Sequence, residues 1–232
     1  MDFSTLNCWL NIDKPLEMSS ARAVAIVKRL TKAKKVGHGG TLDPMATGIL
    51  PIALNKATKT SENMMSARKK YAFTIKWGEM RDTDDAEGAV EAVSAIRPAT
   101  AQLISVLPQF IGKIQQKPSR FSAIKINGKR AYDLARDGAQ FEIKSREIEI
   151  FSLKMLQNTQ DFCTIEVDCS KGTYVRSLSR DIALELGACG YVSSLTRLQV
   201  GQFLYKNKIS LEKLKNIVMM GGDVLDGSLF HI

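Results

Sequence analysis

The stretch best suited to chemistry is a glycine-rich loop within residues 37–54, which read GHGGTLDPMATGILPIAL. It contains His38, one of only two histidines, and Asp43, which stands directly before a proline. Imidazole and carboxylate groups can serve as acids, bases or nucleophiles. An aspartate among glycine and proline is also a common turn residue, so a structural role for Asp43 remains open at this point.

The pattern around Asp43 excludes several familiar sites. A Walker phosphate loop ends in Gly-Lys-Ser/Thr, which this loop lacks, and Leu42 stands where a dinucleotide fingerprint needs its third glycine. No Gly-x-Ser-x-Gly elbow is present. A glycosidase needs a second carboxylate, and the nearest acidic cluster, residues 82–85, is far away in sequence. The histidines and cysteines lack zinc-site spacing, so we expect chemistry without a metal.

Charge indicates the class of partner. Lys and Arg outnumber Asp and Glu by 33 to 24, a net charge of +9, which favours a polyanion such as nucleic acid. No apolar run reaches the length of a membrane span, and the N-terminus does not resemble a signal peptide, so we expect a cytoplasmic protein without a membrane partner. Free thiols are expected at the four cysteines, Cys8, Cys163, Cys169 and Cys189.

Hydrophobic periodicity predicts the elements that must position the loop. Strands are expected at 8–12, 71–77, 141–156, 162–169 and 191–204. Helices are expected after Ser19 or Ser20, at 55–69, at 100–110 with Thr100 as cap, after an Asn127-Gly128 turn up to Gly138, up to Gly187, and from Ser210. Hairpins without regular βαβ alternation favour a mixed α/β (α+β type) domain with an antiparallel-rich central sheet and flanking helices.

Four stretches, in this order, resemble the TruB family of tRNA pseudouridine synthases, and together they cover most of residues 8–205. They are NIDKPLEMSS (11–20), GHGGTLDPMATGILPIAL (37–54), KKYAFTIKWGEMRDTDDAEG (69–88) and CSKGTYVRSLSRDIALELG (169–187). The segment FSAIKINGKRAYDLARDG also resembles the family. The resemblance implies the pseudouridine synthase fold in a catalytic domain at 1–207. A helix and tail at 208–232 follow, with the family's PUA-type domain absent or truncated.

The resemblance also implies an activity. Family members isomerise uridine 55 of the tRNA T loop, without a cofactor, after flipping the base out of its stack. We therefore expect an isomerase whose partner is the T-arm stem-loop of tRNA, acting as a monomer. A non-catalytic RNA-binding protein of the same fold is the alternative, whereas a small-molecule glycosidase would not explain the positive charge.

Seven residues match the family's functional positions. Asp43 is the expected catalytic carboxylate, as nucleophile or as base, and Arg176 is expected to pair with it and keep it ionised. Tyr71 is expected to stack on the flipped uracil, although its alternation with Phe73 and Ile75 taken alone favours a core residue. The other residues expected to bind substrate are His38, Tyr174, Leu195 and Asp85.

Three further features bear on the site. Gly39 stands where the family commonly has threonine, which is expected to loosen the loop. Lys14 and Pro15 match the first motif and are expected to be structural. The cations within 28–35 and 68–70 are candidates for phosphate contacts, although the first group also fits a solvated helix end.

Overall fold

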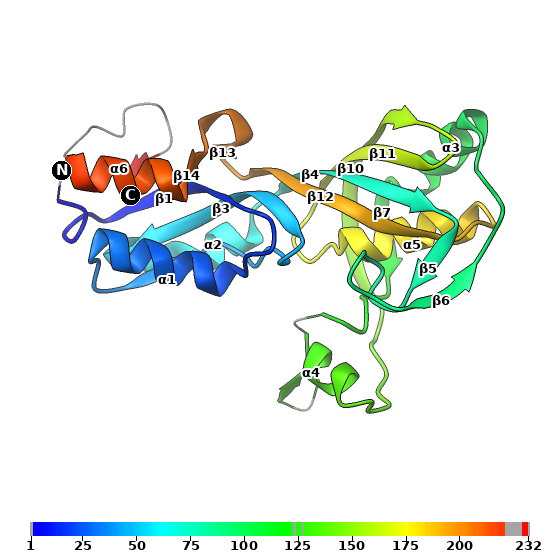
Figure 1. The fold of residues 1–232 in the computed structure, drawn as a ribbon, viewed down its shortest axis with the longest axis horizontal. Coiled ribbons are helices and arrows are strands. Elements are labelled where there is room, and N and C mark those ends of the chain that lie inside the picture. Colours follow the sequence, from blue (N-terminus) through cyan, green and yellow to red (C-terminus); the bar gives the residue numbers. More distant parts are fainter. Residues whose placement is uncertain (1, 123, 127, 221–228, 232) are drawn as a thin grey trace. The chain divides into compact units, whose positions relative to one another are not determined.

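A computed structural model describes residues 2–122, 124–126, 128–220 and 229–231. The chain forms two compact units (Figure 1). Unit 1 contains Met1–Tyr71 and Leu195–Ile232, and unit 2 contains Ala72–Ser194. The chain passes from one unit to the other within strand β4 (Lys69–Trp77) and again within strand β12 (Gly190–Val200).

Unit 1 is built on a mixed sheet. Its central strand β3 (Ala46–Leu54) is antiparallel to β1 (Cys8–Lys14) and parallel to β12, where Leu195 lies opposite Ala46. Almost every residue of β3 is buried, so the apolar run after Asp43 anchors the loop in the core, as expected. The shorter strands are β2 (Val36–His38), β13 (Phe203–Leu204), β14 (Ile209–Ser210) and β15 (Leu229–His231).

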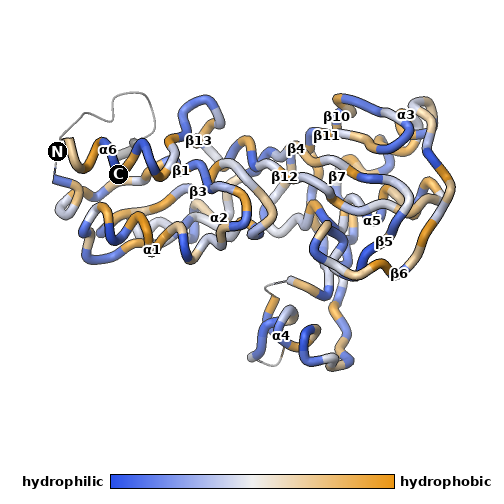
Figure 2. Tube along the Cα trace, in the orientation of Figure 1, coloured by the Kyte–Doolittle hydropathy of each residue, from blue (hydrophilic) through white to orange (hydrophobic). Residues whose placement is uncertain are grey.

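Helix α1 (Ser20–Thr31) begins as the sequence predicts. Ser19 is its N-cap and accepts a hydrogen bond from Arg22 N over 3.2 Å. Ala23 and Val27 are buried on one face, and Figure 2 shows hydrophobic and hydrophilic residues alternating along the helix. The C-terminal helix α6 (Leu211–Met220) packs against α1 and β1.

The helix predicted at 55–69 is largely wrong in type and extent. The structure has a 3₁₀ helix, η1 (Asn55–Thr60), and a short helix α2 (Ser61–Ser66). The hydroxyls of Thr58 and Thr60 each donate over 2.8 Å to the carbonyl oxygen three residues earlier. These i to i−3 side-chain bonds match the tighter turn of a 3₁₀ helix. A further 3₁₀ turn, η3 (Tyr205–Asn207), follows β13.

Unit 2 is built on antiparallel pairs. Strand β10 (Arg146–Asn158) pairs with β11 (Phe162–Cys169) on one side and with β7 (Gly112–Gln116) on the other. Two small hairpins join β5 (Glu79–Arg81) to β6 (Val90–Val93) and β8 (Lys125–Ile126) to β9 (Lys129–Arg130). The helical segments are α3 (Thr100–Val106), η2 (Leu107–Phe110), α4 (Ala131–Arg136) and α5 (Val175–Glu185).

The predicted fold class is confirmed, although further elements differ from prediction. The helix at 100–110 changes to 3₁₀ at Leu107, next to Pro108, and it is preceded by Ala99, whose N–H donates to Gln102 Oε1 over 2.8 Å. Thr100 is thus the first helical residue and not the cap. The strand expected from 141 begins at Arg146. Asn127 of the predicted turn lies outside the described residues. None of the described helices is long and apolar enough to cross a membrane.

Three of the four cysteines are buried, and all four are free thiols, as predicted. Cys189 is half-buried. Burial raises the thiol pKa of Cys8 to about 11 and that of Cys163 to about 12, because the thiolate loses its hydration. These two thiols are therefore inert packing residues at neutral pH.

Candidate active site

A buried arginine holds the backbone on one side of Asp43. Arg197, on β12, is 1% exposed. Its Nη2 and Nη1 donate to the carbonyl oxygens of Gly40 and Thr41, each over 3.1 Å, and its Nε donates to Ile49 O over 2.7 Å. A buried guanidinium needs acceptors for its N–H groups, and here backbone carbonyls of the loop supply them. The guanidinium therefore fixes where the loop leaves β2 and where it enters β3.

A buried lysine holds the other side. Lys14, at the end of β1, is fully buried, and its Nζ donates to the carbonyl oxygens of Pro15, Met18 and Pro44 over 2.9, 2.7 and 3.1 Å. Burial lowers the pKa of Lys14 to about 8, and the negative charge of Asp43 opposes that shift. The structure thus shows Lys14 supporting the turn behind Asp43, in keeping with the structural role expected for it.

Helix α1 supplies a third support. The Ser20 hydroxyl donates to Leu42 O and accepts from Leu42 N, both over 2.9 Å. Ala46 N donates to Asp43 O over 3.1 Å, which closes the turn through Pro44. The Asp43 residue itself is half-buried. Its backbone is therefore held on both sides, and this pre-organisation is what a catalytic carboxylate requires.

His38 lies in β2 and is half-buried. Its Nδ1 accepts a hydrogen bond from Gly40 N over 3.2 Å, which assigns the proton of the neutral ring to Nε2. Burial, and then the positive charge of Arg197, lower the pKa of His38 below its ordinary value. The neutral ring therefore carries a donor at Nε2.

Gly39 is packed rather than loose, which corrects the expected loosening of the loop. It is buried, and its N–H donates to Pro51 O over 2.9 Å. A Cβ added here would lie 2.2 Å from Met64 Cγ and 3.2 Å from Trp9 Cζ3. The Met64 side chain therefore occupies the space that a larger residue at position 39 would need.

Tyr71 and Leu195 are the other expected site residues of unit 1. Phe73, Ile75 and Trp77 share the alternation of Tyr71 along β4 and are buried, whereas Tyr71 is only half-buried. Leu195 is 8% exposed and lies opposite Ala46, three residues from Asp43.

Of the three cations at 68–70 that were expected to contact phosphates, Lys69 does not fit that prediction. Lys69 is 7% exposed, and its Nζ donates to the carbonyl oxygens of Met65 and Ala67 over 2.5 and 2.6 Å. These bonds close the end of α2, so Lys69 is a structural residue and not a phosphate contact.

The remaining expected site residues lie in unit 2, where Arg176 pairs with Asp85. Arg176 Nη1 lies 3.3 Å from Asp85 Oδ2, and the same nitrogen donates to Thr83 O over 3.0 Å. Asp85 Oδ1 accepts from Thr83 Oγ1 over 2.6 Å and from Glu87 N over 3.1 Å. The pairing of Arg176 with Asp43, which would join the two groups of residues, stays a prediction.

Tyr174 precedes α5, and Gln116 fixes its backbone. Gln116 is fully buried; its Oε1 accepts from Tyr174 N over 2.8 Å, and its Nε2 donates to Tyr174 O over 3.0 Å. The Arg146 guanidinium lies 4.8 Å from the centre of the Tyr174 ring. No motif or spacing in the sequence marks Gln116 or Arg197 as a residue of the site.

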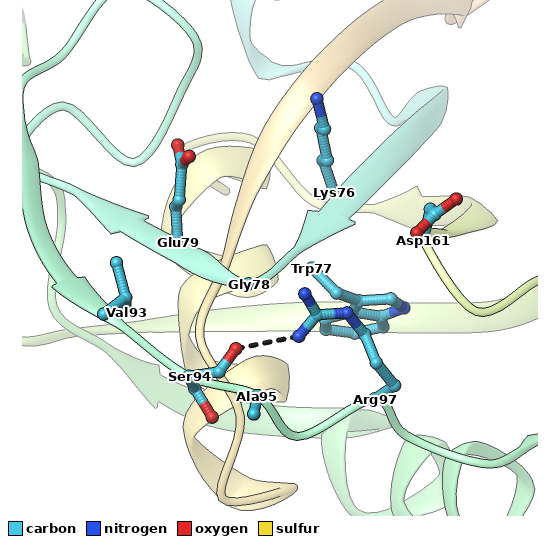
Figure 3. Close-up of a pocket in the computed structure, with 9 residues that line it drawn as sticks. All are labelled: Lys76, Trp77, Gly78, Glu79, Val93, Ser94, Ala95, Arg97 and Asp161. Atoms are coloured by element: carbon cyan, nitrogen blue, oxygen red, sulfur yellow. Dashed lines mark hydrogen bonds between the residues drawn. The ribbon is translucent and has the colours of Figure 1, made fainter.

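A separate cavity of about 540 Å³ opens in unit 2 (Figure 3). The Arg97 side chain lies across it and donates to Ser94 O over 2.8 Å. None of the seven expected site residues lines this cavity, so it does not belong to the candidate site.

Within the described part of the chain, no group of three or more His, Cys, Asp or Glu side chains is arranged to hold a metal ion.

Comparison with known sequences identifies the family. Residues 28–175 match the model of the TruB family pseudouridylate synthase (N terminal domain). The chain belongs to the TruB family. It is 50% identical over 210 residues to tRNA pseudouridine synthase B of Caulobacter vibrioides, covering 90% of this chain and 68% of that protein. The corresponding protein of Ehrlichia ruminantium is 48% identical over 220 residues, covering 93% and 73%. A third TruB-family relative, from Bradyrhizobium diazoefficiens, is 50% identical over 208 residues; the chain spans 60% of its length.

Solved structures show the same fold. A chain in the crystal structure of a Cbf5-Nop10-Gar1 complex superposes with a TM-score of 0.75 and 25% identity over 99% of this TruB-family chain and 60% of its own length. A chain of an H/ACA RNP bound to a substrate RNA containing 2'-deoxyuridine gives 0.72 at 23% identity, covering 97% and 59%. The second likeness shows the fold alone.

Proposed function

We propose that this chain is a tRNA pseudouridine synthase that isomerises uridine 55 in the T loop, with Asp43 as the catalytic carboxylate. The observation that carries the proposal is the supported loop of unit 1. Lys14 and Arg197, both buried, bind the carbonyl oxygens of Gly40, Thr41 and Pro44 on the two sides of Asp43. The names of the relatives support the reaction and the tRNA substrate.

The chemistry fits a site with one supported carboxylate. The reaction breaks the bond between N1 and C1′, turns the base and joins C5 to C1′. C5 loses its proton and N1 gains one, so the product is an isomer of the substrate and no external reactant is needed. One ionised carboxylate beside the ribose can act as nucleophile or as base. A turn residue alone would not need two buried cations around it, since burying each cation carries a desolvation cost.

The substrate base must leave its stack, which costs a few kcal/mol, and stacking on an aromatic ring offsets about 1–3 kcal/mol of this. Tyr71 suits this role because it stays half-exposed on a strand face whose other members are buried. The His38 Nε2–H and the Tyr174 ring, the latter placed through Gln116, are the proposed further contacts to the T arm. The net charge of +9 suits the phosphates of tRNA.

An assay on unmodified tRNA transcript tests the proposal. Pseudouridine is detected by chemical labelling after incubation with wild type, Asp43→Asn and, as a matched control, Glu62→Gln, which alters an exposed carboxylate on α2. We expect product at position 55 with wild type and Glu62→Gln and none with Asp43→Asn. Product with Asp43→Asn would overturn the role of Asp43, and product at another uridine would overturn the assigned position.

The sequence left a non-catalytic RNA-binding protein as the alternative. The relatives from Caulobacter, Bradyrhizobium and Ehrlichia do not favour it, since each is named tRNA pseudouridine synthase B. The same assay separates the two functions, because a binding protein would retain tRNA without forming product. We further propose that the chain acts in the cytoplasm as a monomer.

A further inference from the structure

Arg180, on α5, binds three groups at once. Its Nη1 donates to Asp84 Oδ2 over 3.0 Å, and its Nη2 donates to Lys117 O over 2.8 Å. Its Nε and Nη2 also donate to Asp181 Oδ1 over 3.0 and 2.9 Å. The Arg180 side chain is 21% exposed, and the Asp84 side chain is 7% exposed. The planar fork of the guanidinium therefore joins two segments that are distant in sequence.

The first segment is the acidic loop, residues 82–88. Asp84 has a φ of 62°, in the left-handed region that non-glycine residues rarely adopt. Its carbonyl accepts from Val192 N over 3.0 Å, and its N–H donates to Arg81 O over 2.9 Å. Residues in such a conformation persist where the surroundings over-determine them, and they cluster at functional sites. Arg180 and Ser119 supply part of that restraint through the Asp84 side chain.

The second segment is the start of the basic insertion, which we define as residues 117–145 between β7 and β10. It contains seven basic and three acidic residues. Figure 1 shows this insertion carrying α4 away from the sheet of unit 2. Ser119 and Ser122 are buried at its start, and Ser119 Oγ donates to Thr83 O over 3.4 Å. The start of the insertion is thus packed against the acidic loop.

The two segments meet on one face of α5. Arg176 and Arg180 are four residues apart and so point the same way. Arg176 Nη2 donates to Phe121 O over 3.1 Å and its Nη1 pairs with Asp85, the neighbour of Asp84. A shift of Asp84 would therefore also move the carboxylate of its neighbour Asp85, which pairs with the expected site residue Arg176.

We propose that Arg180 is a positioning residue, which couples the acidic loop to the basic insertion and thereby sets the orientation of the Asp85–Arg176 pair. The proposal rests on the proposed function for its effect on rate. The coupling itself is a property of the free protein, so it can be measured without substrate. Arg180 does not act on the reacting atoms; it acts through Asp84 and through the backbone of Lys117.

Arg180→Lys is the informative variant, because it keeps the charge and loses the fork. A lysine can pair with Asp84 as a point charge but cannot bridge to Lys117 O with the same geometry. Asp84→Asn is its partner variant, since asparagine tolerates the left-handed conformation of position 84 where alanine would be strained. Arg97→Lys is the matched control, because Arg97 is exposed in the same unit and donates to the carbonyls of Ser94 and Ile96.

Hydrogen exchange on the free full chain tests the coupling. We expect Arg180→Lys to speed exchange in 82–88 and in 117–122 together, with β10 and β11 unchanged, and Arg97→Lys to alter neither segment. Exchange that rises in one segment only, or in neither, would overturn the coupling whatever the activity.

Single-turnover kinetics on tRNA transcript, well below the melting temperature of every variant, test the effect on rate. Misplacement of site groups predicts a fall of about 10-fold to 100-fold for Arg180→Lys. The double variant with Asp84→Asn should lose no more than the larger single loss. A wild-type rate in Arg180→Lys, or losses that multiply, would overturn the positioning role. If wild type itself makes no pseudouridine while exchange responds in both segments, the proposed function is wrong and the coupling stands.

Discussion

Lys14 Nζ donates to the carbonyl oxygen of Pro44 over 3.1 Å, so a buried ammonium lies behind the turn that contains Asp43. The ammonium supplies donors to three carbonyl groups and so holds the turn behind Asp43. The negative charge of Asp43 in turn keeps the pKa of Lys14 from falling further below its ordinary value.

Lys14→Met should therefore reduce the single-turnover rate strongly while changing the free energy of unfolding only modestly. Methionine keeps the length of the side chain and removes the ammonium, which leaves three carbonyl groups without their donor but also removes the cost of burying a charge. We expect the single-turnover rate to fall by about 10-fold to 100-fold because the Asp43 loop shifts. Lys208→Met is the control, since Lys208 pairs with Asp13 near the same strand. Equal losses of rate in the two variants would contradict this role.

The sequence predicted the elements whose signals are local. The Ser19 cap and the spacing of Ala23 and Val27 predicted α1, and the alternation of Phe73, Ile75 and Trp77 predicted β4. The 3₁₀ form of η1 was missed because its threonine hydroxyls bond to nearby carbonyls, a competition that periodicity does not report.

The supports of the site left no such signal. Arg197 binds carbonyl oxygens more than 140 positions earlier, and Gln116 binds the backbone of Tyr174. Every residue type has a backbone carbonyl, so no pattern of residue types marks these contacts. The identity of Asp43 as the candidate catalytic group came from the resemblance to the TruB family rather than from the spacing of the loop.

Gly39→Thr should perturb the loop unless Met64 is made smaller. The added Cβ would lie 2.2 Å from Met64 Cγ, so the methionine or the loop must move. We expect Gly39→Thr to lower stability by about 1–3 kcal/mol, the usual cost of overpacking, and to reduce the rate. Met64→Ala creates space on its own, so the double variant should be more stable than the two separate losses predict. Additive losses in thermal unfolding would show that position 39 and Met64 are independent.

Lys34 and Lys35, in the connection between α1 and β2, should contribute to the salt dependence of tRNA binding. Both are exposed, and their backbone N–H groups donate to Asn55 Oδ1 over 3.0 and 3.4 Å, which fixes this connection in place. Changing both to glutamine should weaken binding and reduce the slope of log K against log salt by about 1–2, since each lost duplex phosphate contact removes ~0.9. Lys154→Gln is the control: it changes an exposed lysine on β10 and should leave the slope unchanged. An unaltered slope in the double variant would place the phosphates elsewhere.

Asp84 should make stability depend on pH between about 4 and 6. Burial raises its pKa to about 6, which outweighs the opposing effects of Arg180, Arg176 and Ser119, while Asp181 adds to the rise. A carboxyl whose pKa is higher in the folded than in the unfolded protein favours folding when protonated. Its contribution to stability is therefore complete below the unfolded value of 3.8 and is lost as the pH rises through about 6.

Asp84→Asn removes this titration. Urea unfolding at pH 4 and at pH 7 should therefore show the wild type losing about 2–3 kcal/mol relative to Asp84→Asn over this range. In Arg180→Ala the loss should extend to higher pH, because a charge that lowers the Asp84 pKa is gone. A difference between wild type and Asp84→Asn that stays constant from pH 4 to 7 would show that Asp84 titrates normally and is not held as a buried anion.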